Sequence, residues 1–207
     1  MSGYAKVNLL DISEVAGLEK VSEVISDFSC PRNSDVEDFL QDKAFVFSKQ
    51  RIASTYLIFS SYKERPVLVG YFALTNKHFH IDTQKPGGIS KNLLKRISKF
   101  AVRDRELNKY IISAPLIGQL GKNYANGYDK LIAGDELLKI ACDTVREALR
   151  IIGGKLVYLE CEDVPSLVRF YEENGFYNFG RRALEGDEKS KLKGDSLVQM
   201  LRYLGEP

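Results

Sequence analysis

A long helix between two strands in the middle of the chain constrains the fold more than any other sequence feature. Residues 134–152 carry apolar side chains at helical spacing, and the Gly153–Gly154 pair that follows predicts the helix end. Extended segments at residues 110–122 and 155–161 flank this helix. Strand, helix and strand in this order predict a crossover between parallel strands of one sheet.

Further strands and helices are predicted on both sides of this crossover. The predicted strands are residues 6–12, 54–60, 66–74 (with 78–81 as a continuation), 110–122, 155–161, 176–182 and 196–203. The predicted helices are residues 14–28, a helix from Ser34, 91–102, 134–152 and 164–174. Helix starts are expected at Ser34 with Glu37 in a capping box, at Ser90 and at Asp163. Because hairpins accompany the crossover, we expect a mixed sheet in a single α/β (α+β) domain over residues 1–207.

Composition excludes several classes of protein. The 207 residues include 44% apolar positions and nearly equal numbers of basic and acidic side chains, which is typical of a globular chain rather than a disordered one. No run of about 18 apolar residues exists, so we expect no membrane span. The N-terminal apolar patch is too short for a secretory signal, and the three cysteines lack metal or disulfide spacing. A cytoplasmic location is therefore expected.

Basic residues are concentrated in one part of the chain. Eight basic and two acidic side chains lie between Lys85 and Lys109, whereas the whole chain carries a net charge of only +2. Five of them mark a predicted cationic helix face: Lys91, Lys95, Arg96, Lys99 and Arg103. One interpretation is a contact with RNA phosphates, and the other is an ordinary solvated helix face.

The strand at residues 110–122 contains Pro115, Gly118 and Gly121. Such residues weaken a central strand and usually mark a bulge or a place where a ligand approaches the backbone. The alternative is a bulge that only bends the sheet. The His78-x-His80 pair on the preceding strand has no third ligand at a supportive spacing, so we predict no metal site.

Two segments resemble the GNAT superfamily of N-acetyltransferases. Residues 156–176 end in Phe170-Tyr171-Glu172-Glu173-Asn174-Gly175-Phe176, which is similar to the superfamily's FYExxGF signature, and residues 115–138 resemble its fourth strand, pyrophosphate loop and following helix. Scattered matches between residues 28 and 74 resemble the GNAT toxins of bacterial toxin–antitoxin pairs. The resemblance implies a splayed sheet of about seven strands flanked by helices.

The resemblance also implies acetyl-CoA as co-substrate, in the split between the superfamily's fourth and fifth strands. Backbone amides of Leu120, Gly121 and Lys122 would face the thioester and pantetheine. The pyrophosphate would lie at the start of the following helix, at Lys130, Leu131, Ile132, Ala133, Gly134 and Asp135, with Lys130 as counter-charge. However, only the final glycine of the Q/R-x-x-G-x-G/A loop motif is present, and Asp135 and Glu136 place carboxylates in the first helical turn. Without the resemblance, an ordinary core helix after a solvent loop is the simpler interpretation.

Tyr171 is the implied general acid that protonates the CoA thiolate as it leaves. The alternative is core packing, because Leu167, Phe170 and Tyr171 lie at helical spacing. Glu160, Glu162 and Asp163 are base candidates, but a role as cap or surface residues is favoured for each. An acceptor α-amine with a pKa near 8 is already neutral to a substantial extent at physiological pH, so no strong base is required.

The resemblance therefore implies an N-acetyltransferase that transfers acetyl from acetyl-CoA to a primary amine. The first candidate acceptor is the amino group of aminoacyl-tRNA, as in the toxins. The second is a protein or small-molecule amine, and the third possibility is a non-catalytic acetyltransferase-like module. An antitoxin protein and a second copy of the chain are further partners to consider.

Overall fold

The computed structural model describes residues 3–186, 188–190, 192 and 194–205. The chain folds into two compact units. Unit 1 comprises Met1–Thr75 and Ile117–Ala141, and unit 2 comprises Asn76–Leu116 and Cys142–Pro207. Strands β3 (Arg65–Asp82) and β5 (Lys109–Lys122) and helix α6 (Gly134–Ile152) contribute residues to both units. That the two units make one domain stays a prediction.

The structure is a mixed α/β fold built on an eight-stranded mixed sheet flanked by helices. The strand order is β1-β2-β3-β5-β6-β8-β7, and β4 pairs with β5 beside this path. The strands are β1 (Tyr4–Asn8), β2 (Ser54–Tyr62), β3 (Arg65–Asp82), β4 (Ala101–Asp104), β5 (Lys109–Lys122), β6 (Leu156–Glu162), β7 (Tyr177–Ala183) and β8 (Ser196–Tyr203). The expected mixed sheet is confirmed, and β4 is the strand that was not expected.

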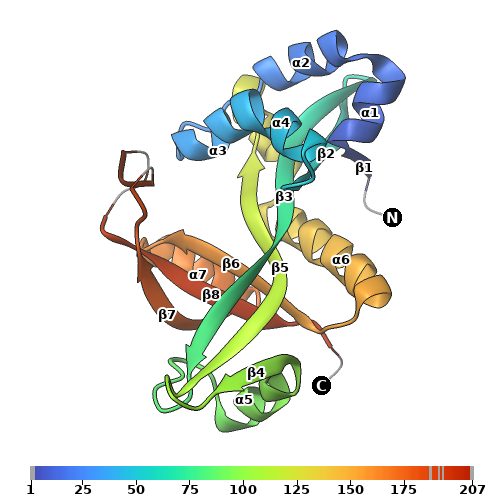
Figure 1. Cartoon of the computed structure of the whole chain (residues 1–207). Helices are drawn as coiled ribbons and strands as arrows, with labels where there is room; N and C mark the ends of the chain where they lie inside the picture. The colour runs from blue at the N-terminus through green and yellow to red at the C-terminus, as the bar shows by residue number, and fades with distance from the viewer. Residues whose placement is uncertain (1–2, 187, 191, 193, 206–207) are drawn as a thin grey trace. The chain divides into compact units, whose positions relative to one another are not determined.

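Unit 1 contains an antiparallel sheet covered by four short helices. These are α1 (Leu9–Ala16), α2 (Leu18–Ser26), α3 (Ser34–Asp38) and α4 (Ala44–Lys49), with a π-helical turn, η1 (Phe39–Lys43), before α4. Figure 1 shows them in blue, gathered over the β2–β3 hairpin. The hairpin closes at Lys63 and Glu64, which both have positive φ as a tight primed turn requires. The predicted hairpin is confirmed.

The start of unit 1 differs from the predicted strand 6–12 and helix 14–28. The strand ends at Asn8, whose side chain caps α1, and Gly17 (φ 87°) separates α1 from α2. The predicted capping box at Ser34 is also wrong. Asn33 is the N-cap of α3, and the Glu37 carboxylate accepts instead from the backbone N–H of Cys30 at 2.5 Å. Asn is as good a cap as Ser, so periodicity alone does not fix the start.

Unit 2 contains strands β6, β8 and β7, with β8 antiparallel to both of its neighbours. Its helices are α5 (Lys91–Ile97), α7 (Pro165–Glu173) and the later part of α6 (Gly134–Ile152). β5 and β6, which flank α6 in the chain, are neighbours in the sheet, as the strand–helix–strand pattern predicts. The core of unit 2 contains stacked aromatic rings: the ring centroids of Phe79 and Tyr158 lie 4.4 Å apart.

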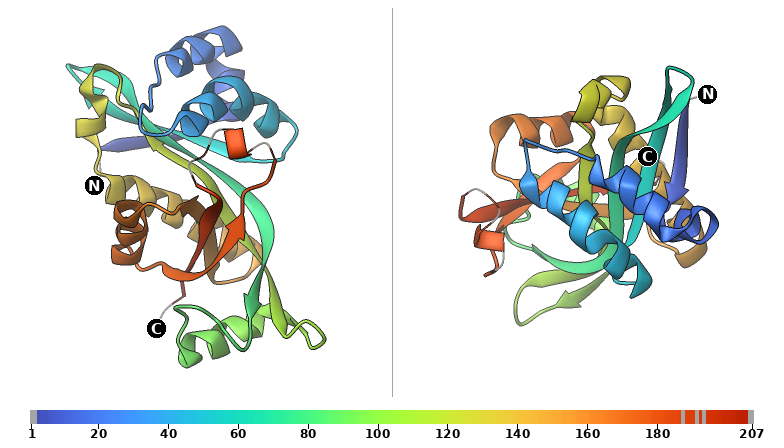
Figure 2. Two further views of the ribbon diagram at one scale, coloured as in Figure 1. Left: turned by 90° about the vertical axis from the view of Figure 1, so that its left-hand side faces the viewer. Right: turned by 90° about the horizontal axis from the view of Figure 1, so that it is seen from above.

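The basic segment does not form one helix over residues 91–102. Ser90 caps α5 as predicted, but α5 ends at Ile97 and a 3₁₀ turn, η2 (Ser98–Phe100), leads into β4. β4 then forms a hairpin with the start of β5, and Asn108 has the positive φ that its turn needs. We call α5, η2 and β4 together the excursion (residues 91–104), which Figure 2 shows in green. Pairing with β5 overrides the helical pattern after Ile97.

Among the described residues, no helix is both long enough and apolar enough to cross a membrane.

The end of β5 is closely packed, and this packing makes a testable prediction. A Cβ on Gly121 would lie 2.4 Å from Cγ1 of Val36. Gly121→Ala is therefore expected to lower the free energy of unfolding by about 1–3 kcal/mol in urea titrations, as overpacking usually does. Gly3→Ala is the matched control, because a Cβ there meets nothing within 4 Å. In a double-mutant cycle Val36→Ala should relieve part of the loss, and additive effects would contradict the proposed clash.

Candidate functional site

The loop after β5 in unit 1 is anchored by a buried asparagine. Asn123 is only 1% exposed. Its side-chain oxygen accepts from the N–H groups of Ser29 and Ala125, both at 3.0 Å, and its amide donates to the Leu68 carbonyl at 2.9 Å. Its backbone N–H donates to the Val69 carbonyl at 2.9 Å. These bonds fix the point where the chain leaves the sheet.

The loop then makes a 3₁₀ segment, η3 (Ala125–Leu131), and turns at Asn126 and Gly127, which have φ of 54° and 74°. The Lys122 ammonium donates to the Ile132 carbonyl at 2.9 Å, so the end of β5 and the end of the loop are tied together. Ile132 is buried, whereas Lys130 and Ala133 are exposed.

Helix α6 starts at Gly134, and its first turn carries its own acceptor for a loop amide. The Glu136 carboxylate accepts from the backbone N–H of Ala133 at 3.1 Å. The same carboxylate oxygen accepts from the hydroxyl of Tyr4 at 2.9 Å. The hydroxyl also lies 3.0 Å from the Leu131 carbonyl. Burial and the hydrogen bond with Glu136 raise the pKa of Tyr4, so its hydroxyl stays a donor at physiological pH.

Unit 1 therefore brings together the residues predicted to contact the co-substrate. Leu120, Gly121 and Lys122 end β5, and Lys130 and Leu131 end η3, while Ile132 and Ala133 join η3 to Gly134 and Asp135 of α6. The glycine at 121 has a packing reason, since Val36, Phe28 and Tyr71 fill the space beside its α-carbon. Gly118 is exposed.

Tyr171 lies in unit 2 on α7, and its side chain is 8% exposed. Its ring makes edge contacts with those of Phe170 and Phe176. Burial raises the pKa of Tyr171 well above its ordinary value of 10, and the nearby thiols of Cys161 and Cys142 add to this. The phenol is therefore protonated, as a general acid must be, but these contacts are also those of a core residue. Its catalytic role stays a prediction.

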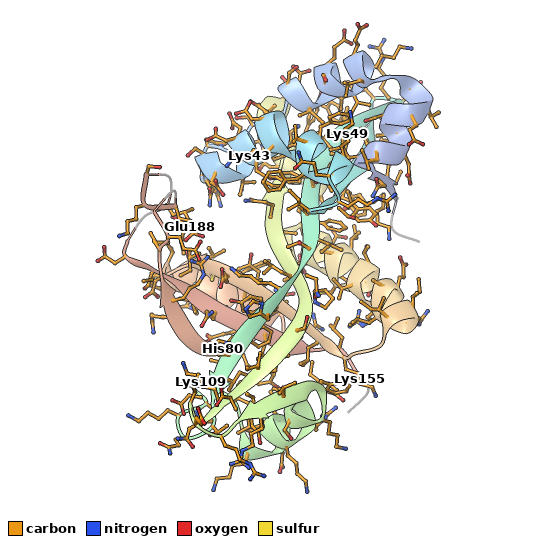
Figure 3. All side chains as sticks on the ribbon, in the orientation of Figure 1. Lys43, Lys49, His80, Lys109, Lys155 and Glu188 are labelled. Carbon is orange, nitrogen blue, oxygen red and sulfur yellow. The ribbon has the colours of Figure 1, made fainter. Side chains whose placement is uncertain are left out.

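A polar cluster that periodicity did not reveal lies on one face of the unit 2 sheet. Its centre is the Glu160 carboxylate, whose side chain is 8% exposed. Arg182 pairs with it at 2.6 Å, and the Tyr158 hydroxyl donates to it. The other members are Gln199 (3.3 Å from Glu160), Lys77 (3.5 Å from Glu160) and Glu188, which pairs with Arg182 at 2.6 Å. Figure 3 labels Glu188. Tyr158 and Glu160 are two residues apart on β6, so their side chains lie on the same face of the sheet. This spacing was the sequence signal that could have indicated the cluster.

The cluster makes Glu160 a poor general base. Burial alone would raise the pKa of its carboxyl, but hydrogen bonds from Arg182 and Tyr158 bring that pKa below its ordinary value of 4.5. Asp163, expected to cap α7, pairs instead with Arg181 at 2.9 Å, and Val164 takes the N-cap position without a side-chain bond. The Pro165 ring presets the first helical turn, so no side-chain cap is required there.

The basic residues of the excursion in unit 2 are divided among three elements. Lys91 and Lys95 lie exposed on α5, Lys99 lies exposed on η2, and Arg103 lies exposed on β4. Arg96 stacks over the ring of Tyr203 at 3.9 Å.

The two histidines lie at the far end of β3. His78 and His80 are exposed with ring centroids 6.1 Å apart, and Figure 3 labels His80 and Lys109 in this region. Over the described residues, no group of three metal-ligating side chains is found.

The polar cluster predicts a specific pH dependence of stability. Because folding depresses the pKa of Glu160, its contribution is present above about pH 4.5 and is lost as the pH falls through the lower folded-state pKa. Glu160→Gln should lower the free energy of unfolding at pH 7 by about 1–3 kcal/mol, and this difference should shrink below pH 4.5. Urea unfolding at several pH values measures both, with the exposed Glu173→Gln as control. A difference that stays constant to pH 3 would contradict the assignment.

No protein-family model matches the chain, and no curated protein matches its sequence. Solved structures do match its fold. A tyrosine-to-phenylalanine mutant of KacT aligns with a TM-score of 0.59 and 16% identity, covering 95% of this chain and 94% of that chain. AtaT complexed with acetyl-methionyl-tRNAfMet aligns with a TM-score of 0.58 and 16% identity, covering 94% and 93%.

A third match has a bound co-substrate. It is a tyrosine-to-phenylalanine mutant of the AtaT toxin bound to acetyl-CoA and the C-terminus of the antitoxin AtaR, with a TM-score of 0.53 and 14% identity over 95% of this chain and 92% of that chain. At such low identities the likeness establishes the fold alone. It confirms the fold that the sequence resemblance implied: the chain has a GNAT-like fold, which it shares with KacT and with the toxin AtaT.

Proposed function

We propose that the chain is an N-acetyltransferase that transfers the acetyl group of acetyl-CoA to a primary amine. The observation that carries this proposal is the loop of unit 1, which leads from the end of β5 through a left-handed turn into the start of α6. Amides at a helix start bind phosphate groups well. A structure of AtaT, which shares the fold, contains acetyl-CoA.

The residues of unit 1 fit the diphosphate of acetyl-CoA, provided that the Ala133 amide becomes available. The loop from Leu131 to Asp135 offers backbone donors at the start of the 19-residue α6, and Lys130 is an exposed counter-charge. The amide of Ala133, however, is bonded to Glu136. The backbone of Leu120–Lys122 is proposed to face the thioester arm.

The chemistry requires attack of a neutral amine on the thioester carbonyl, release of the CoA thiolate, and loss of one proton from the new amide nitrogen. We assign the protonation of the thiolate to Tyr171, whose phenol is protonated at physiological pH. A base is not assigned, because the Glu160 carboxylate is held by Arg182 and Tyr158. An α-amine as acceptor needs none.

The acceptor that we propose first is the amino group of an aminoacyl-tRNA. The exposed cations of the excursion support it: Lys91, Lys95, Lys99 and Arg103. AtaT is known in complex with acetyl-methionyl-tRNAfMet. Arg96 is a weaker phosphate ligand than the sequence suggests, because its guanidinium stacks on Tyr203. The loss of Arg96 as a phosphate ligand favours the second candidate acceptor, a protein or small-molecule amine.

Partner proteins follow from the same comparison. AtaT is bound to the C-terminus of the antitoxin AtaR in one structure, and on this likeness we propose an antitoxin as a partner of the chain. Pairing with a second copy stays a prediction.

Tyr171→Phe tests the general acid. We expect kcat for acetyl transfer to fall by about 100-fold or more, with the KM for acetyl-CoA little changed, because the variant loses only the proton donor. Transfer is measured by mass spectrometry on aminoacyl-tRNA and on free amines. Tyr177→Phe, at an exposed tyrosine of β7, is the control. Unchanged turnover in a normally folded Tyr171→Phe protein would remove Tyr171 from the mechanism.

Charge reversal tests the acceptor. Changing Lys91, Lys95 and Lys99 together to Glu should weaken acetylation of aminoacyl-tRNA and reduce the slope of log affinity against log salt by about 2–3, since each phosphate contact contributes about 0.7–0.9. The same reversal at Lys20, Lys43 and Lys49 in unit 1 is the matched control. Equal effects of the two triple variants, or transfer that does not respond to salt, would favour the free-amine acceptor.

A further inference from the structure

One hydrogen bond of the chain occupies a donor that the proposed site needs. Ala133 directly precedes α6, and its backbone N–H donates to Oε2 of Glu136 at 3.1 Å. Ala133 is exposed and Gly134 is half-buried, so a ligand can reach this point of the loop. The carboxylate therefore lies where an oxygen of a bound diphosphate would accept from the same amide.

A residue from another part of unit 1 holds the carboxylate in this position. Tyr4 lies on β1, far from α6 in the sequence, and its hydroxyl donates to the same Oε2 of Glu136 at 2.9 Å. The hydroxyl is itself placed next to the loop, 3.0 Å from the Leu131 carbonyl. A helix-capping glutamate needs only its bond to the N-cap amide, so the hydrogen bond from Tyr4 is additional to ordinary capping.

Among the described residues, neither Lys122 nor Lys130 of the loop pairs with the Glu136 carboxylate. The Lys122 ammonium is bonded to the Ile132 carbonyl, and Lys130 is exposed. Asp135 adds a second carboxylate to the first turn of α6. A diphosphate that arrives at the loop therefore meets like charge at the start of the helix, where the helix dipole alone would attract it.

We propose that Glu136 and Tyr4 form an intramolecular latch: the Glu136 carboxylate occupies the Ala133 amide in the empty protein and has to leave it before a diphosphate-containing ligand binds. This inference rests on the proposed function of the loop. The latch makes Glu136 a determinant of affinity for the diphosphate part of coenzyme A and leaves the pantetheine part unaffected. A ligand that takes the amide displaces the carboxylate, and the Tyr4 hydroxyl is then released as well.

Isothermal titration with coenzyme A tests the latch on the full chain. We expect Glu136→Gln to bind about tenfold more tightly than the parent protein, since the ligand no longer displaces an anion, a change within the usual range of coupling between two binding events. Tyr4→Phe should tighten binding by about two- to threefold, because it frees the carboxylate without removing its charge. Pantetheine, which has no diphosphate, should give the same result with all of these proteins.

Asp135→Asn is the matched control, because it removes one carboxylate from the same turn of α6. If its effect equals that of Glu136→Gln, the charge of the helix start is responsible and the latch is wrong. Glu136→Gln keeps a side-chain oxygen that can cap Ala133, and melting temperatures check that each variant is folded. Tyr4→Phe provides the test if Glu136→Gln does not fold.

The remaining outcomes separate the two proposals. If the parent protein binds coenzyme A and Glu136→Gln binds equally or more weakly, Glu136 is an ordinary cap: the latch is overturned, and the proposed function stands. If neither the parent protein nor any variant binds coenzyme A, the proposed function fails and the latch fails with it.

Discussion

The side chain of Asn123 fixes the point on which the candidate site depends. A buried amide in an apolar setting is costly unless all its groups are paired, and Asn123 pairs both ends of its amide with backbone groups of three different segments. The first of these segments is β3, the second precedes α3, and the third is the loop itself. The point where the loop leaves β5 is therefore fixed, and the bond from Lys122 to the Ile132 carbonyl ties the end of the loop back to the end of β5.

The two units use charge in different ways. In unit 2 the carboxylates of Glu160 and Glu188 share the Arg182 guanidinium, and hydrogen bonds from neutral side chains complete the cluster. Hydrogen bonds from Arg182 and Tyr158 hold the pKa of Glu160 below its ordinary value, so this carboxylate is a weak base. The acceptor proposed above, an α-amine, needs no strong base. In unit 1 the carboxylate of Glu136 is exposed and bonded to one amide. It is the group that a ligand can displace.

The sequence predicted the framework of the fold better than its details. The 19-residue helix α6 and strand β8 were predicted with the observed bounds, because long apolar periodicity and glycine pairs are strong signals. The Asn8 cap, the break at Gly17 and strand β4 were missed. The cap depends on one hydrogen bond, the break on one residue with positive φ, and β4 on pairing with the start of β5. The loop residues were identified by resemblance. The contacts of Asn123, Tyr4 and Lys122 were not, because they join residues up to 132 positions apart.

Amide hydrogen exchange with and without coenzyme A tests the central claim most directly, because it reports each backbone donor of the folded chain. The account predicts that slowed exchange on ligand addition is concentrated in residues 120–137, with the Ala133 region included, and that the β7 strand in unit 2 is unchanged. Slowed exchange confined to unit 2, or no change in residues 120–137 at saturating ligand, would show that coenzyme A does not bind at the loop after β5.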